Sequence, residues 1–305
     1  MFLFPKITRA NFLPASLIPF LAGAGFAHYR GYALYPLVLF LGLAGTAFAH
    51  LGANAINNYW DHKSGADGIG SGRSAFFGGS GLIARGQASP RRVLFWGKLL
   101  MALSFASGLA LFLVVFDYRI LLFMLAGGVL AVGYTAPPLK LAYRRGGEAV
   151  IFLLFGPLLS AGSFLIFTGM LGPEPFLVSL PIGFLVLAVI LCNEVPDIKT
   201  DTEAGKKNLM TAAGRRKAWI LYIVPVGMAA CFTVLNVLYG LFPVSALVCL
   251  PFFILGYRAA SLLRDLSGGF AEYNKASKLT VGLHTAAGIV IVLSFFFGGS
   301  CPKIS

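Results

Sequence analysis

Eight stretches of the chain contain no charged residue, and each is 18 to 40 residues long. A helix needs about 20 apolar residues to cross the hydrocarbon core of a bilayer, where charged side chains are poorly tolerated. The longest stretch is twice that length, and Gly240 and Pro243 near its middle signal a turn that divides it into two helices. The sequence therefore predicts an all-α integral membrane protein, with nine transmembrane helices in a single bundle. The uncharged stretches are residues 10–29, 31–60, 99–116, 120–139, 149–173, 175–193, 218–257 and 279–302.

The composition agrees with this fold class. Of the 305 residues, 58% are hydrophobic and only 11% are charged, whereas about one quarter of the residues of a soluble domain are charged. The four cysteines include no Cys-x-x-Cys pair, and the four histidines lack ligand spacing, so a disulfide framework or a zinc site is not expected. We expect one transmembrane domain over residues 1–305, with cytoplasmic cap loops at about 61–92 and 194–217.

The basic residues predict the orientation. If the N-terminus is cytoplasmic, all but three of the 24 Lys and Arg residues fall in cytoplasmic segments, the exceptions being Arg30, Arg119 and Lys303. Membrane proteins concentrate positive charge on that side, where it also meets anionic lipid. Topology thus explains much of the net charge of +13. We expect a multi-pass protein of the cell inner membrane that contacts membrane lipid and no nucleic acid.

Six of the 11 acidic residues lie in two short stretches at the cytoplasmic ends of the second and sixth predicted spans. Both stretches begin Asn-x-x-x-Asp, and they are 136 positions apart on the same side of the membrane. An internal repeat of four helices would produce this arrangement. Helical spacing places each of two triplets on one helix face, the first being Asn54, Asn57 and Asp61 and the second Asn193, Asp197 and Asp201.

Carboxylate clusters that face one another repel unless cations lie between them. Hard oxygen ligands favour Mg²⁺, which typically binds one or two carboxylates together with the phosphate oxygens of a substrate. A magnesium diphosphate is therefore the expected guest. For one stretch alone, solvated helix ends or helix caps would be an equal explanation, but two matching stretches favour a site.

The same residues resemble a known family. The pattern Asn57-x-x-x-Asp61-x-x-x-x-x-Asp67, followed by Asn193-x-x-x-Asp197-x-x-x-Asp201 and Gly205-Lys206-Lys207-Asn208-Leu209, is similar to that of the UbiA superfamily of intramembrane aromatic prenyltransferases. Two further segments, from Arg9 to Gly23 and from Tyr134 to Lys140, are also similar to family segments. The spacing from Asp61 to Asp67 and the later Gly78-Gly79-Ser80-Gly81 resemble the MenA branch, which prenylates 1,4-dihydroxy-2-naphthoate on the menaquinone pathway.

Two positions depart from the family pattern. Members often carry Asp immediately after the first Asn, where this chain has Asn58, and many carry Arg or another polar residue where it has Pro196. Proline disfavours the helical conformation at the residue before it. We therefore expect the sixth span to break just before Asp197.

The resemblance implies a Mg²⁺-dependent transfer of a prenyl group from a polyprenyl diphosphate to an aromatic acceptor, expected to be 1,4-dihydroxy-2-naphthoate. Mg²⁺ would neutralise the diphosphate as it leaves. The active site would face the cytoplasm. The implied catalytic residues are Asp61, Asp67, Asp197 and Asp201, which would also hold the metal, together with Asn57 and Asn193. The implied substrate-binding residues are Arg73, Arg85, Tyr134, Lys140, Tyr143, Lys206 and Asn54.

The binding candidates also have structural interpretations. Arg73 and Arg85 lie in the segment 65–86, whose eight glycines form either flexible filler or a lid that approaches phosphate and excludes water. Any single basic residue could serve topology alone. Tyr134 and Tyr143 could face a carbocation or anchor the protein at the membrane interface. Glu148 could cap the fifth predicted span or touch the substrate.

Two other functions stay open on the sequence. A member of the same superfamily could use another acceptor, such as 4-hydroxybenzoate, because the residues that choose the acceptor cannot be identified from one sequence. A secondary transporter would also combine many spans, an internal repeat and buried polar groups. Its site is expected near the middle of the membrane, however, whereas the charged groups here gather at one face.

Overall fold

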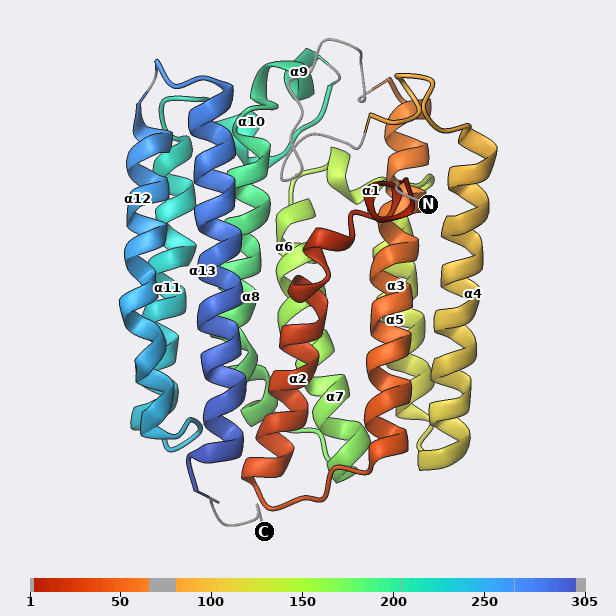
Figure 1. Ribbon diagram of the computed structural model, residues 1–305, viewed down its shortest axis with the longest axis vertical. Helices are drawn as coiled ribbons and strands as arrows, with labels where there is room; N and C mark the ends of the chain where they lie inside the picture. The colour runs from red at the N-terminus through yellow and green to blue at the C-terminus, as the bar shows by residue number, and fades with distance from the viewer. Residues whose placement is uncertain (1–2, 66–80, 204, 266, 300–305) are drawn as a thin grey trace.

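The structure, a computed structural model, describes residues 3–65, 81–203, 205–265 and 267–299, and every regular element in these ranges is a helix. Long helices stand side by side in one bundle, and the short helices α1, α9 and α10 lie at one end of it (Figure 1). The predicted all-α membrane fold is confirmed. The long helices are α2 (Pro14–Tyr29), α3 (Pro36–Lys63), α4 (Pro90–Val115), α5 (Arg119–Gly133), α8 (Pro173–Glu194), α11 (Ala218–Leu238) and α13 (Phe270–Phe297).

Two further rods are composite, and five elements are short. The first rod consists of α6 (Gly147–Leu153), the π-helical turn η3 (Leu154–Leu158) and α7 (Leu159–Thr168), and the second of the 3₁₀-helix η4 (Val244–Phe252) and α12 (Phe253–Arg264). The short elements are α1 (Phe4–Ile7), η1 (Ala10–Phe12), η2 (Leu141–Tyr143), α9 (Ile198–Glu203) and α10 (Leu209–Ala213).

Eight helical stretches in the described part of the chain are long and apolar enough to cross a membrane, and each overlaps a predicted span. The 40-residue stretch is divided where the turn signal predicted, because α11 ends at Leu238 and η4 begins at Val244. The fourth predicted span, 120–139, is helical only as far as Gly133. Pro137 and Pro138 cannot continue a helix, since proline lacks the amide hydrogen and clashes with the preceding turn. Nine spans and a cytoplasmic N-terminus remain predictions.

The sixth predicted span breaks as the sequence predicted, because α8 ends at Glu194 and α9 begins at Ile198. The break corrects another expectation. Asn193 lies in the last turn of α8, Asp197 in the connecting turn and Asp201 in α9, so these three residues do not share one face of a continuous helix. The amide of Asp201 still donates to the carbonyl of Asp197 at 2.7 Å, which keeps the turn compact.

Small residues allow close approach between the central helices. Gly23 of α2 lies against α7, where an added Cβ would collide with the Ser160 carbonyl and come within 2.9 Å of the Ser163 Cβ. Ser160 also donates a hydrogen bond to the carbonyl of Pro19 at 2.8 Å. Phe26, one turn further along α2, stacks on Phe164 of α7 with ring centroids 5.3 Å apart. These contacts hold α2 and α7 together in the buried centre of the bundle.

We predict that Gly23→Ala destabilises the protein, because the new methyl group meets backbone that cannot move without separating α2 from α7. Overpacking of this kind typically costs about 1–3 kcal/mol. Gly227→Ala on α11 is the matched control, since no described atom lies within 4 Å of the Cβ it would add. Thermal denaturation in detergent should give a lower midpoint for Gly23→Ala only, and equal midpoints for the two variants would contradict the close packing.

Candidate active site

A cavity of about 490 Å³ lies among the helices, and both polar stretches line it. On the α3 wall, the lining changes from Leu41 and Gly42 to Asn54, Asn57 and Asp61 as the helix approaches the end that carries α9 and α10 (Figure 1). Along α3, the lining is therefore apolar towards the start of the helix and polar towards its end. Residues from the second stretch line the same cavity, and they are Asn193, Glu194, Asp197 and Asp201.

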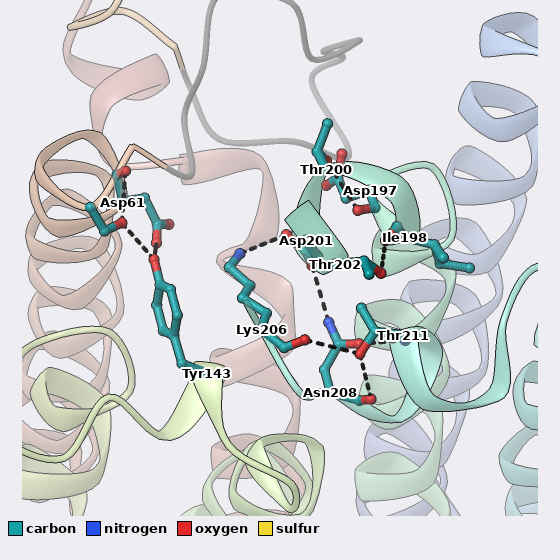
Figure 2. A network of polar contacts seen from close by, with 11 residues as sticks. Asp61, Tyr143, Asp197, Ile198, Thr200, Asp201, Thr202, Lys206, Asn208 and Thr211 are labelled. Carbon is teal, nitrogen blue, oxygen red and sulfur yellow. Dashed lines mark hydrogen bonds and ion pairs between the residues drawn. The ribbon is translucent and has the colours of Figure 1, made fainter. Parts of the chain in front are cut away.

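A series of polar contacts links Asp61 on α3 to Asp201 on α9 (Figure 2). The Tyr143 hydroxyl donates to Asp61 Oδ1 at 3.3 Å and shares a hydrogen bond of 2.6 Å with the Ser64 hydroxyl. Lys206 Nζ lies 5.2 Å from the centroid of the Tyr143 ring and forms an ion pair of 2.9 Å with Asp201 Oδ1. Tyr143 and Lys206 thus bridge two acids that are far apart in the sequence.

The electrostatics keep Lys206 charged. Burial alone would lower the pKa of Lys206, but the nearby carboxylates of Asp61 and Asp201 outweigh it and hold the pKa above its usual value. The pKa of Tyr143 is also raised, first by burial and then by the charge of Asp61. The Tyr143 phenol therefore stays protonated at neutral pH and able to donate to Asp61.

The segment that carries Lys206 is anchored on both sides. Asn208 Nδ2 donates to Asp201 Oδ2 at 3.1 Å, while Asn208 Oδ1 caps α10 by accepting from the amide of Thr211 at 2.7 Å. Glu148, which is only 1% exposed, accepts from the amide of Leu209 at 2.5 Å. Glu148 does not line the cavity, and its hydrogen bond goes to α10 rather than to its own helix α6. Its observed role is to hold the segment beside Lys206.

The other predicted binding residues fall into three groups. Tyr134 lines the cavity, as do Asn54 and Lys206. Arg85 and Lys140 are exposed and do not line it. Lys140 instead adopts a left-handed backbone conformation and lies 5.8 Å from the centroid of the Tyr143 ring. The third group is Arg73, which lies outside the described residues, as do the predicted metal ligand Asp67 and Gly78, Gly79 and Ser80 of the glycine-rich segment.

Some residues that line the cavity received no role from the sequence. Glu194 Oε2 is buried without a hydrogen-bond partner among the described residues, and Thr135 donates to Asn57 Oδ1 at 2.6 Å. Arg9 also lines the cavity. Glu194 directly follows Asn193, which the sequence assigned to the site, so its position in the motif could have identified it. Nothing local in the sequence points to Thr135, because its partner is 78 positions away.

The donor set suits a hard divalent cation that is shared with a ligand. Within the described ranges, no group of three or more His, Cys, Asp or Glu side chains could hold a metal ion by itself. Carboxylates that line the cavity nevertheless come from two separate elements, α3 and the α8–α9 turn. Mg²⁺ commonly completes its coordination with water and substrate phosphate oxygens. The carboxylate oxygens at this end of the cavity therefore fit Mg²⁺ held jointly by the protein and a phosphate group.

Comparisons with known proteins identify the family of the chain. Residues 16–278 match the model of the UbiA prenyltransferase family. The chain is 31% identical over 241 residues to the 1,4-dihydroxy-2-naphthoate octaprenyltransferase of Bacillus subtilis, a match that covers 77% of this chain and 73% of the relative. It is 28% identical over 263 residues to the protein of the same name from Mycobacterium tuberculosis, covering 86% of each.

Solved structures show the same fold. A UbiA homolog from Archaeoglobus fulgidus bound to GPP and Mg²⁺ superposes with a TM-score of 0.65 at 19% identity, covering 93% of this chain and 98% of that one. The apo UbiA homolog from Aeropyrum pernix K1 gives a TM-score of 0.70 at 15% identity, covering 90% of this chain and 96% of that one. Since the family model spans most of the sequence and the B. subtilis enzyme is a clear relative, the chain belongs to the UbiA family of membrane prenyltransferases.

Proposed function

We propose that this enzyme transfers the prenyl group of a polyprenyl diphosphate to 1,4-dihydroxy-2-naphthoate, with Mg²⁺ as cofactor, at the cytoplasmic face of the cell inner membrane. One observation carries the proposal: acids from α3 and from the α8–α9 turn line one end of a cavity whose other lining is mostly apolar. A prenyl diphosphate has a matching division into a charged head and a hydrocarbon tail. The names of the B. subtilis and M. tuberculosis relatives support the acceptor, and the A. fulgidus homolog bound to GPP and Mg²⁺ supports the donor and the metal.

The reaction requires the control of two opposite charges. As the bond between C1 and the diphosphate oxygen breaks, the prenyl group becomes an allylic cation and the leaving group gains negative charge. Mg²⁺ would supply Lewis-acid neutralisation of that leaving group. In our proposal, Asp61, Asp197 and Asp201 hold the metal together with Asp67, which the structure does not describe. Lys206 adds a fixed positive charge beside Asp201.

The amides and aromatic groups would orient the two substrates. Because Thr135 occupies Asn57 Oδ1, the amide hydrogens of Asn57 remain as donors toward a diphosphate oxygen. Asn193 would contribute in the same way from the end of α8. The ring of Tyr134 lines the cavity and would offer its electron-rich face to the carbocation. The apolar walls deeper in the cavity would keep water from that cation.

A direct assay distinguishes the proposed function from prenyl transfer to another acceptor and from transport. Purified protein in nanodiscs would be given labelled farnesyl or geranylgeranyl diphosphate, Mg²⁺ and a panel containing 1,4-dihydroxy-2-naphthoate and 4-hydroxybenzoate. Transfer to the naphthoate with diphosphate release supports the proposed function. Preference for 4-hydroxybenzoate would change the acceptor, and absence of transfer to every acceptor would contradict the proposal.

We predict that transfer stops when Mg²⁺ is chelated, and that Asp61→Asn or Asp197→Asn lowers the rate by about 10²-fold or more, the typical effect of losing one group that stabilises developing charge. Each variant keeps the size of the side chain but loses a metal-binding charge. Glu203→Gln is the matched control, since Glu203 is an exposed acid of α9 that does not line the cavity. Retained activity in both Asp variants, with an unchanged thermal midpoint, would contradict their role as metal ligands.

A second prediction concerns the cation of the site. Lys206→Gln should raise the KM for the prenyl diphosphate by about tenfold, because a charge-assisted contact to the donor is lost. Lys199→Gln, at an exposed lysine of α9, should leave that KM unchanged.

The folded-state pKa of Lys206 is raised, so its charge and its stabilising contribution are fully present below its ordinary pKa and are lost only as the pH rises through the folded-state value. The KM should therefore stay flat from about pH 7 to 9 in the wild type, and a rise over that range would contradict this assignment.

A further inference from the structure

Glu148 has no part in the reaction outlined above, although it is a buried acid on a helix that lines the cavity. It lies in the first turn of α6 and is only 1% exposed. Among the described residues, its one hydrogen bond joins Oε1 to the amide of Leu209 at 2.5 Å, and Oε2 is buried without a partner. Burial of a carboxyl group costs more free energy than one such bond restores. Stability alone therefore does not explain why an acid occupies this position.

The amide that Glu148 binds belongs to the segment that carries Lys206. Leu209 begins α10, and Asn208, directly before it, caps this helix and donates to Asp201 Oδ2 at 3.1 Å. Lys206 is joined to the same acid twice. Its Nζ forms the ion pair with Asp201 Oδ1 (Figure 2), and its amide donates to the Asp201 carbonyl at 2.9 Å. Glu148 thus fastens one side of a short segment whose other side holds Asp201.

The start of α6 also contacts the segment that carries Tyr143. Gly147 packs so closely on η2 that an added Cβ would lie 2.7 Å from the Leu141 carbonyl oxygen. Tyr143 ends η2, and its carbonyl accepts from the amide of Lys207 at 3.4 Å. The two residues that bridge the acids, Tyr143 and Lys206, are therefore held by backbone segments that both meet the first turn of α6.

We propose that Glu148 is a positioning residue for the site of the prenyl diphosphate, an inference that rests on the proposed function. By accepting from the Leu209 amide, Glu148 fixes the segment that holds Lys206 against Asp201. Charged groups that are fixed before the ligand arrives need no rearrangement when it binds, so affinity for the diphosphate is higher. Glu148 acts through this hydrogen bond and not through its charge. A neutral acceptor at the same position would therefore preserve binding of the donor.

Three substitutions separate the hydrogen bond from the charge. Glu148→Gln keeps an oxygen that can accept from the Leu209 amide, whereas Glu148→Met has a similar length and only a weak sulfur acceptor. Glu148→Asp keeps the charge but is shorter by one methylene group, so its oxygens no longer reach that amide.

The measurement is binding of geranylgeranyl thiolodiphosphate, a stable analogue of the donor, in the presence of Mg²⁺. Equilibrium dialysis would use the full chain in nanodiscs, with empty nanodiscs as a blank. We expect Glu148→Met and Glu148→Asp each to weaken binding by about tenfold, and Glu148→Gln to stay within about threefold of the wild type.

A double-mutant cycle tests whether Glu148 acts through Lys206. If it does, Glu148→Met should weaken binding by less than about threefold once Lys206→Gln is present, because effects within one network are not additive. Ser160→Ala is the matched control for a merely structural role. It removes one buried hydrogen bond, to the carbonyl of Pro19, from a residue that does not line the cavity. It should lower the thermal midpoint and leave binding of the analogue unchanged.

Equal losses in Glu148→Gln and Glu148→Met would assign the effect to the charge and overturn the inference. Unchanged binding in both Glu148→Met and Glu148→Asp would also overturn it. Full additivity of Glu148→Met with Lys206→Gln would contradict an action through Lys206.

The same measurements separate this inference from the proposed function. Wild-type protein that binds the analogue, with the loss in Glu148→Met and the rescue in Glu148→Gln, but transfers no prenyl group to any acceptor would refute the proposed function and keep the inference. Prenyl transfer by the wild type, with binding unchanged in Glu148→Met, would keep the function and refute the inference. Failure of the wild type to bind the analogue would count against both.

Discussion

Carboxylates gathered at one end of a mostly apolar cavity are the constraint on which the rest of the site depends. Asp61 comes from α3, whereas Glu194, Asp197 and Asp201 come from the end of α8, the turn that follows it and α9. Like charges repel strongly where the surroundings exclude water, so the arrangement calls for cations. Lys206 supplies one of them through its ion pair with Asp201 (Figure 2). Arg9 lines the same cavity, and the Mg²⁺ that we propose would bring further positive charge with the diphosphate.

The break after α8 creates the geometry of this end of the cavity. A continuous helix would have carried Asn193, Asp197 and Asp201 outward in one column along its axis. The chain instead turns at Pro196, and α9 brings Asp201 to the ion pair with Lys206. Asn208 fastens the next turn to Asp201, and Glu148 holds that turn from α6. A local interruption of one helix is thus stabilised by contacts from several elements.

Much of the fold could be predicted because the signals are local. Hydrophobic length identified the spans, and the interruptions at 239–243 and at Pro196 follow from residues that cannot continue a helix. The alignment of Asn54, Asn57 and Asp61 along the cavity was also predictable, since α3 is continuous from Pro36 to Lys63. The same periodicity argument failed for the second triplet, because it assumed a helix that the proline interrupts. The length of α5 was overestimated for a related reason, as hydrophobicity alone does not show where a helix ends.

The sequence by itself determined the membrane-spanning architecture, the two acidic motifs and the family to which they point, because hydrophobicity, helical period and residue spacing are properties of neighbouring residues. Only the tertiary structure decided which side chains meet. Tyr143 reaches Asp61 across 82 positions, and Glu148 reaches the amide of Leu209 across 61. Ser16 and His50 pair across 34 positions. No local pattern encodes such contacts, because they arise when packed helices bring distant segments to the same depth in the bundle.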